Sequence, residues 1–396
     1  MKTLKKIGKW FLIIFVILNI GILVSGRSYL YKGIGNTYLK GRSGPSIDEY
    51  QIFDNREVAS GQYVPWHHAK GYNSRTVPAA FTTGFETLQT IAYVIIKDDS
   101  LIHEQYWDGY GEDSHTNSFS MAKTFVSILI GIAIDEGKIK SVDQPVSDFL
   151  PEYKDGENAK LTIKHLLTMS SGINFDENYV NPFAYPAAAY YGKDLKKLTD
   201  KYSVKETPGK TFKYLSGNSV LLALILQKAT GKSVSEYASE KLWKPLGAKN
   251  KAFWSLDHEN GLEKAYCCFN SNAPDFARIG ELFLDSGKFN GTQIVSADYT
   301  INSVKTAELI YEDGRANEKY GYAWWLIPDY LPAGQTGKGH RIYYARGILG
   351  QYIICIPDKK MVVVRLGKKR EKQAPTDAHP KDVFMYIDAA LEMYGN

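Results

Sequence analysis

The sequence predicts an α+β protein in which an antiparallel sheet is flanked by helices and carries an inserted all-helical lobe. Two strand patterns precede a long apolar helix, a run of helical patterns follows, and strand patterns return only near the carboxyl end. Strands and helices segregated in this way, without βαβ alternation, favour an antiparallel α+β arrangement. We expect the helical lobe to occupy about residues 140–290.

The first expected elements are a β-hairpin and the helix that follows it. Residues 91–97 and 101–107 have strand character around a short acidic turn. A helix is expected from about Ser120 to Glu136, where the side chains are apolar almost all round and Gly137 provides the stop. A helix without a polar face is buried, so we place this one between two lobes.

Helical patterns occupy the middle of the chain, and strand patterns return after them. The expected helices cover residues 163–169 behind a Thr162 cap, 219–230 ending at Gly231, 233–243 with a Ser233 and Glu236 capping box, and 275–285. The expected late strands cover residues 322–327, 341–345, 351–356 and 361–366, and the last two form a hairpin. An amphipathic helix at residues 381–393 closes the chain.

Residues 1–26 have the pattern of an export signal or a membrane anchor. Lysines precede an apolar run from Trp10 to Ser25, which is longer than a usual signal core and shorter than the roughly 20 residues of a typical span. Val24 and Gly26 are small enough for a cleavage site, so cleaved secretion stays open as an alternative. In both cases the positive-inside rule keeps the lysines in the bacterial cytoplasm and places the rest of the chain outside.

The remaining chain divides into an expected lead-in and a catalytic body. Residues 27–79 are rich in Gly, Ser, Tyr and Pro without a sustained period, so we expect an extended segment that wraps the body at residues 80–396. The chain has a formal net charge of +5. Five cations before residue 28 account for that charge: Lys2, Lys5, Lys6, Lys9 and Arg27. The body therefore has no basic excess, and a nucleic-acid partner is not expected.

The three cysteines and the adjacent histidines give no sign of a disulfide framework or a metal site. Cys267 and Cys268 are neighbours in the sequence and are expected not to bridge each other, and Cys355 lies in a strand pattern. We expect all three to be core residues. His67 and His68 lack further ligands at metal-binding spacing, so we expect no metal and no organic cofactor.

Ser120 and Lys123 form the only Ser-x-x-Lys in the chain, at the start of the apolar helix. Residues three apart on a helix lie on one face, so the lysine can reach the serine oxygen. A serine hydroxyl needs a neighbouring base to become a nucleophile, and a lysine removed from water can accept its proton. Backbone N–H groups at the helix start can then stabilise an acyl oxyanion. The competing interpretation is a surface lysine beside an ordinary serine.

Several ordered motifs together resemble the serine β-lactamase-related hydrolases, which include class C β-lactamases, DD-peptidases, esterases and 6-aminohexanoate-dimer hydrolases. The resemblance extends over about residues 85–367 and is strongest to the 6-aminohexanoate-dimer hydrolases. It rests on Ser120-Met121-Ala122-Lys123, on residues 142–146 and 161–172, and on the stretch Pro208-Gly209 to Tyr214. It implies a β-lactamase/transpeptidase-like fold and hydrolysis through an acyl-enzyme.

The resemblance also implies roles for residues outside the Ser-x-x-Lys pair. Tyr214 matches the tyrosine of a Tyr-x-Asn motif and would pass protons to the leaving group, whereas Ser216 replaces the asparagine. The Lys-Thr-Gly motif is matched best by Ala345-Arg346-Gly347, where only the glycine is kept. Gly347 would leave space for the substrate beside the strand, and the Ile348 N–H would join that of Ser120 as an oxyanion donor.

Two further points concern the substrate. The missing lysine at Ala345 makes a penicillin hydrolase or DD-carboxypeptidase less expected, although Arg346, Arg341 or Lys338 stand close enough in the sequence to replace it.

Tyr179 falls in the segment that borders the cleft in 6-aminohexanoate-dimer hydrolases. The resemblance implies that it would hydrogen-bond the scissile amide; a solvent-facing loop tyrosine is the alternative.

The sequence therefore predicts an exported, membrane-anchored serine hydrolase that cleaves a small-molecule amide or ester. Ser120 would be the nucleophile, with Lys123 and Tyr214 as the proton shuttle. One alternative is a DD-peptidase or β-lactamase that acts on cell-wall peptides or β-lactams. The other is a non-catalytic binding protein on the same fold. The pattern favours no oligomeric state.

Overall fold

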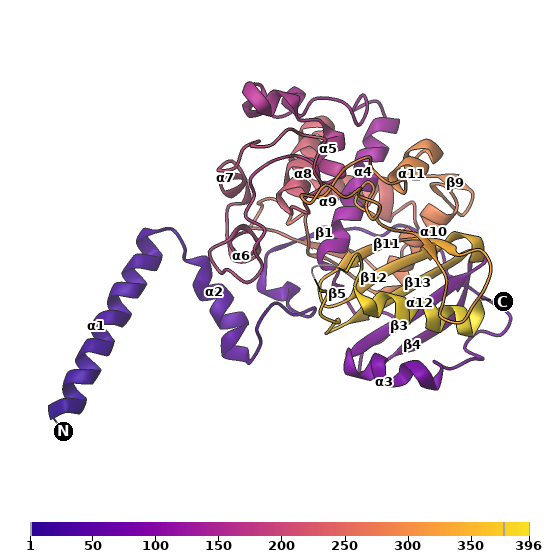
Figure 1. Ribbon diagram of the computed structural model, residues 1–396, viewed down its shortest axis with the longest axis horizontal. Coiled ribbons are helices and arrows are strands. Elements are labelled where there is room, and N and C mark those ends of the chain that lie inside the picture. Colours follow the sequence, from indigo (N-terminus) through magenta and orange to yellow (C-terminus); the bar gives the residue numbers. More distant parts are fainter. Residues whose placement is uncertain (1, 375–376, 396) are drawn as a thin grey trace.

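The computed structural model describes residues 2–374 and 377–395. The chain forms a helical lobe and a sheet lobe, and helix α1 (Lys2–Val24) projects from the side of the helical lobe (Figure 1). The ends of the expected segments at Met1 and Asn396, and residues 375–376 within the expected body, lie outside the described residues.

The sheet lobe contains a seven-stranded sheet in the order β10-β11-β12-β13-β3-β4-β2. Its strands are β10 (Trp325–Tyr330), β11 (His340–Gly347), β12 (Gln351–Ile356), β13 (Met361–Gly367), β3 (Thr90–Lys97), β4 (Ser100–Tyr106) and β2 (His67–His68). Neighbouring strands are antiparallel except for the short edge strand β2, which runs parallel to β4. The predicted antiparallel α+β class is confirmed.

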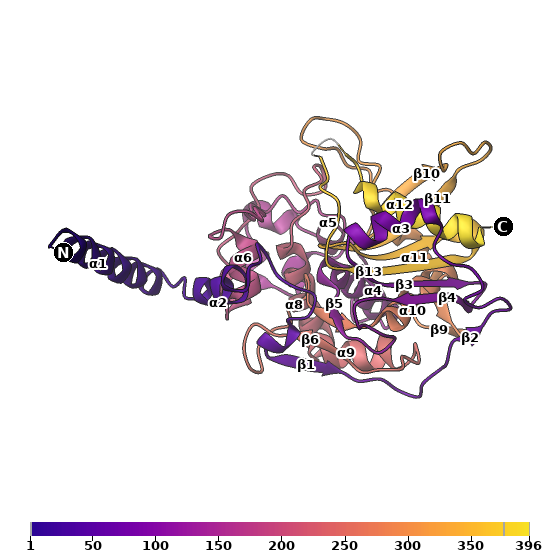
Figure 2. The same ribbon diagram turned by 90° about the horizontal axis from the view of Figure 1, so that it is seen from below.

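Alternation along the strands separates the two faces of this sheet. Val362 and Val364 of β13 belong to the core shared with α10 (Ala273–Leu284). Met361 and Val363 belong to a second core with α3 (Ala79–Thr87) and α12 (Lys381–Tyr394). Helices therefore cover both faces, as Figure 2 shows from below.

The helical lobe is built around α4 (Ala122–Asp135), which follows a single 3₁₀ turn at Phe119–Met121. Every residue of α4 from Ala122 to Ala133 is buried, and Gly137 adopts a left-handed φ of 69° just after the helix. The predicted buried helix and its glycine stop are confirmed. The helices around it are α5 (Ile163–Leu167), α6 (Tyr185–Tyr191), α7 (Leu195–Thr199), α8 (Gly217–Thr230) and α9 (Val234–Ala238).

The lead-in is more structured than the sequence predicted. Helix α2 (Tyr29–Asn36) packs beside α6, although the sequence predicted an extended chain there. Residues Asn55–Val58 form β1, the first strand of a small antiparallel sheet that also contains β6 (Ala252–Ser255), β7 (Phe269–Ser271) and β5 (Thr116–Asn117). These elements lack a sequence period because contacts with the body, rather than their own amphipathic pattern, stabilise them.

Other boundaries differ locally from the prediction. The strand expected at residues 322–327 begins three residues later, because Tyr322–Trp324 form a turn in which Ala323 has a φ of 60°. The helix expected at 233–243 is α9 followed by a π-helical turn at Ser239–Trp243. Short elements were not predicted: α3, α6, α7, α11 (Ala297–Ser303), and the hairpin β8 (Lys288–Phe289) and β9 (Thr292–Gln293).

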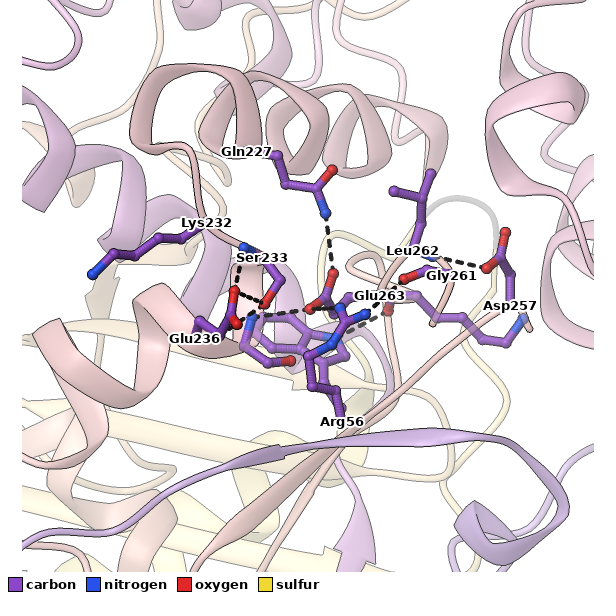
Figure 3. A network of polar contacts seen from close by, with 12 residues as sticks. Arg56, Gln227, Lys232, Ser233, Glu236, Asp257, Gly261, Leu262 and Glu263 are labelled. Atoms are coloured by element: carbon purple, nitrogen blue, oxygen red, sulfur yellow. Dashed lines mark hydrogen bonds and ion pairs between the residues drawn. The ribbon is translucent and has the colours of Figure 1, made fainter. Parts of the chain in front are cut away.

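A buried polar network joins the lead-in to the helical lobe (Figure 3). The Glu263 carboxylate, 1% exposed, accepts hydrogen bonds from Arg56 Nη1 at 2.6 Å and from the Ser235 N–H at 3.0 Å. Gln227 Nε2 donates to its second oxygen at 3.3 Å. Because a buried carboxylate is costly unless it is paired, these contacts connect β1, α8 and α9 through one side chain.

We predict that Glu263→Ala lowers the free energy of unfolding by about 3–5 kcal/mol, because it leaves the Arg56 guanidinium and buried polar groups without their partner. Urea unfolding of the full chain in detergent, followed by circular dichroism, measures the change. The matched control is Lys232→Ala, which breaks an exposed ion pair with Glu240 and should cost less than about 1 kcal/mol. An equal decrease in the free energy of unfolding in the two variants would contradict a stabilising role for the Glu263 network.

Candidate active site

Ser120 lies in a tight turn between β5 and α4. Asn117 accepts the Phe119 N–H on its side-chain oxygen at 2.8 Å, and the Ser118 N–H donates to the Phe269 carbonyl at 2.9 Å. Phe119 has a left-handed φ of 46°, an unfavourable conformation for a bulky residue. Phe119 and Met121 are buried, whereas the Ser120 side chain between them remains partly accessible. The turn therefore presents the hydroxyl outward from a rigid core.

Lys123 is 1% exposed and reaches the serine directly. Its Nζ donates to Ser120 Oγ at 3.0 Å and to the Tyr266 carbonyl oxygen at 2.7 Å. Nζ also lies 5.0 Å from the centre of the Tyr214 ring. The structure thus places Ser120, Lys123 and Tyr214 together, and the surface-lysine interpretation does not describe Lys123.

Tyr214 stands three residues before α8, and aromatic packing sets its position. Its ring centre lies 5.5 Å from that of Trp325 and 6.0 Å from that of Tyr320. Both neighbours are buried, so they restrict the movement of the Tyr214 ring on the side where they pack. Lys123 lies within cation–π distance of the same ring.

Ser216 and Tyr179 meet at Glu177, a residue that the sequence did not single out. The Ser216 N–H donates to Glu177 Oε2 at 2.8 Å, its hydroxyl donates to Oε1, and the Tyr179 hydroxyl donates to Oε1 at 2.6 Å. Burial of that hydroxyl and the adjacent carboxylate raise the pKa of Tyr179 well above its usual range, although the residue as a whole is 56% exposed. Tyr179 is thus held at the cleft by its hydroxyl end. Glu177 was missed because its loop has no period.

Gly347 is required for a different reason than the sequence suggested. A Cβ at this position would lie 2.2 Å from the Ser118 carbonyl oxygen. The close approach is therefore made by the protein's own turn, which packs against β11, and the position beside the glycine is not open to substrate. Ile348 follows directly and borders the same cavity as Ser120.

The position of the missing lysine is occupied by Ala345, which is fully buried in β11. Of the cations proposed to replace it, Arg346 places its guanidinium 3.8 Å from the centre of the Trp325 ring and donates to Gln373 Oε1 at 3.2 Å. Arg341 donates to the Val304 carbonyl instead. Arg346 and Tyr214 therefore contact the same tryptophan ring, which brings one positive charge close to the site.

The adjacent cysteines do form a disulfide, so the prediction that they would not bridge is wrong. The sulfurs of Cys267 and Cys268 are bonded at 2.06 Å, and Cys268 has a left-handed φ of 66°. That backbone turn makes a bridge between sequence neighbours compatible with the chain. Cys355 is a buried free thiol whose pKa is raised by burial, in agreement with a core residue.

Most of the candidate residues line one cavity of about 180 Å³. Its inner wall contains Ser120, Ser216, Ile348 and Cys267. Tyr179, the residues after it and α2 also line the cavity, and the Tyr29 hydroxyl of α2 donates to the Pro182 carbonyl at 3.0 Å. Tyr214 borders a neighbouring surface cleft rather than this cavity. Within residues 2–374 and 377–395, no group of three His, Cys, Asp or Glu side chains is arranged to hold a metal ion.

Comparison with known proteins agrees with this geometry. The chain is 26% identical to the 6-aminohexanoate-dimer hydrolase of Paenarthrobacter ureafaciens over 293 residues, which cover 70% of this chain and 72% of the relative. It is 28% identical to the teichoic acid D-alanine hydrolase of Staphylococcus aureus over 246 residues, or 57% of this chain and 58% of the relative.

The fold is likewise shared with a solved structure from Bacillus anthracis, named as a candidate 6-aminohexanoate-dimer hydrolase. The TM-score is 0.71 at 24% sequence identity, and the match covers 87% of this chain and 93% of the other. A family model described as Beta-lactamase matches residues 79–383. The chain therefore belongs to the β-lactamase family and is a serine hydrolase with the β-lactamase/transpeptidase-like fold.

Proposed function

We propose that this protein is an exported, membrane-anchored hydrolase that cleaves an amide or ester through an acyl-enzyme on Ser120. The observation that carries the proposal is the 3.0 Å contact between Ser120 Oγ and the buried Nζ of Lys123. A serine hydroxyl within hydrogen-bond reach of a base is the arrangement that nucleophilic catalysis requires. The relatives named as hydrolases support the same chemistry.

In this mechanism Lys123 Nζ and Ser120 Oγ exchange donor and acceptor roles across their 3.0 Å contact. Nζ accepts the serine proton on its lone pair while Oγ attacks the carbonyl carbon. The negative charge on the carbonyl oxygen is stabilised by the N–H groups of Ser120 and Ile348. The proton then passes through Tyr214 to the departing nitrogen or oxygen, and the bond to the leaving group breaks. Water attacks the acyl-enzyme by the reverse route and releases the acid.

The substrate is proposed to be a linear amide or ester. Ser216 and Ala345 replace residues of the penicillin-hydrolysing pattern, and Glu177 places a carboxylate behind the cavity wall, next to Ser216 and Tyr179. That charge favours a substrate with a positively charged amino group near its scissile bond. The relatives named 6-aminohexanoate-dimer hydrolase and teichoic acid D-alanine hydrolase are compatible with such a group, because 6-aminohexanoate and D-alanine each carry an amino group.

A cell-wall DD-peptidase or β-lactamase is the alternative within the same chemistry. The proposed location outside the cytoplasm favours it, and Arg346 offers a cation near Tyr214. Fast acylation by a fluorescent penicillin, together with weak turnover of p-nitrophenyl esters, would favour this alternative. A non-catalytic binding protein would react with neither reagent.

We predict that a fluorescent fluorophosphonate labels the full chain and that Ser120→Ala abolishes the label, because Oγ is the atom that forms the covalent bond. Gel fluorescence after labelling measures the result. Ser127→Ala is the matched control, since Ser127 lies on α4, the helix that follows Ser120, and donates to the Tyr322 carbonyl without bordering the cavity. Absence of labelling in the unmodified protein would refute the hydrolase mechanism.

We predict that Lys123→Ala and Tyr214→Phe each lower kcat for a p-nitrophenyl ester by roughly 10²-fold or more, the usual effect of acid–base groups. Stopped-assay or continuous absorbance kinetics measures the change. Tyr153→Phe is the control, because it removes a hydroxyl from a buried tyrosine of the helical lobe that borders a different cleft from the Ser120 cavity. Full turnover in either of the first two variants would show that its residue is not in the proton shuttle.

We predict that protease added outside right-side-out membrane vesicles digests residues 27–396 and spares α1. The reason is that the 22-residue segment Thr3–Val24 of α1 is long and apolar enough on average to cross a membrane, and its most apolar stretch is not buried in the protein. Mass spectrometry of the remaining membrane fragment reads out the topology. Digestion that occurs only after the vesicles are lysed would contradict export.

A further inference from the structure

The wall of the Ser120 cavity is attached very closely to the proposed membrane span. α1 ends at Val24 and α2 begins at Tyr29. Tyr29, Leu30, Gly33 and Ile34 of α2 border the cavity that contains Ser120. Five residue steps extend at most about 17 Å, so the cavity wall cannot move far from the outer end of α1.

A side-chain contact joins the first turn of α2 to α1. The Tyr31 hydroxyl donates to Asn19 Oδ1 at 2.7 Å. Asn19 lies five residues before the end of α1, or about 8 Å along the helix axis. If α1 spans the membrane, this face of α2 is at the depth of the headgroup and acyl boundary, where amphipathic helices lie.

The surface around the cavity mouth is apolar and exposed. Its large side chains come from α2, the residues after it and the loop that follows Tyr179: Tyr31 at 40% exposure, Ile34 at 42%, Tyr38 at 68%, Leu39 at 80%, Val180 at 92% and Phe183 at 59%. We call these six residues the juxtamembrane face. Three of them, Ile34, Tyr38 and Val180, border the Ser120 cavity itself. Exposed apolar side chains grouped in this way mark a contact with another apolar body, and tyrosines are typical of membrane interfaces.

Cations lie next to the juxtamembrane face. Arg27, Lys193, Lys197 and Lys201 border a second groove beside the end of α1, together with a single acid, Asp194. Arg27 stacks 5.5 Å from the centre of the Phe183 ring, which joins the charged groove to the apolar face. Basic side chains beside a span attract anionic lipid headgroups.

We propose that the juxtamembrane face and the adjacent cations rest on the outer leaflet of the membrane, so that Ser120 acts on an amphiphile held in that leaflet. This inference rests on the proposed function, because it requires both the anchor and the serine chemistry. The apolar part of the amphiphile stays at the juxtamembrane face, while its amide or ester carbonyl enters the cavity. A new bond joins Ser120 Oγ to the carbonyl carbon, the amine or alcohol leaves with the proton, and water then releases the acid.

The test compares two esters with the same leaving group. The full chain is reconstituted in vesicles of phosphatidylcholine and phosphatidylglycerol and supplied with p-nitrophenyl acetate in solution or p-nitrophenyl palmitate in the bilayer. Release of p-nitrophenol gives kcat/KM for each. We expect the bilayer ester to be preferred, and the preference to fall when phosphatidylglycerol is left out.

Substitutions test whether the preference for the bilayer ester depends on the juxtamembrane face and the adjacent cations. Lys193→Ser with Lys197→Ser, and separately Leu39→Ser with Phe183→Ser, should lower the ratio of palmitate to acetate turnover about ten-fold or more, since each removes two membrane contacts. None of these residues borders the Ser120 cavity. The matched controls are Lys359→Ser with Lys360→Ser at the far end of β12, and Ile301→Ser with Leu331→Ser on other exposed surfaces.

The outcomes separate this inference from the proposed function. A ratio that is the same in the unmodified protein and in all variants, with esters still cleaved, would overturn membrane docking while leaving the hydrolase in place. Control variants that lower the ratio as much as the docking variants would also overturn it. Loss of both turnover and fluorophosphonate labelling in the unmodified protein would overturn the proposed function and, with it, this inference.

Discussion

The structure depends on holding a buried lysine nitrogen next to an accessible serine oxygen. Among the described residues no carboxylate pairs with Lys123, and its Nζ is held by two neutral oxygens, Ser120 Oγ and the Tyr266 carbonyl. A lysine head group has three donors and would otherwise seek water or an acid. The position of the Tyr266 carbonyl therefore decides whether Lys123 points at the serine.

The segment around Tyr266 is accordingly fixed from both sides. On one side, Glu263 accepts hydrogen bonds from the lead-in and the helical lobe. Next to it, the buried Lys264 donates to the Ala189 carbonyl at 3.0 Å, and burial lowers the pKa of this lysine to about 7. On the other side, the Cys267–Cys268 bridge limits how the chain can move. A lead-in strand thus supports the position of Lys123 through residues that do not contact Ser120.

Local pattern was sufficient to predict the sheet, α4 and the Ser120–Lys123 contact, because each depends on periodicity or on helical spacing within a few residues. The sequence could not predict α2, since its Gly and Tyr residues become helical through packing on α6. It missed Glu177 because the partners Ser216 and Tyr179 meet it only after the chain has folded. The sequence identified Gly347 but not why a glycine is needed there. The Ser118 carbonyl that leaves no room for a Cβ is more than two hundred residues away in the chain.

The proximity of α2 to both α1 and Ser120 limits which molecules the site can meet. An enzyme on a long flexible tether samples substrates in solution. If α1 spans the membrane as proposed, a cavity wall joined to it by the four residues 25–28 remains near the bilayer surface. The local concentration of a membrane-held substrate there far exceeds that of a dilute soluble one. Selectivity in such a site arises from location as well as from pocket shape. A weakly selective pocket beside Ser120 is then compatible with a narrow range of substrates.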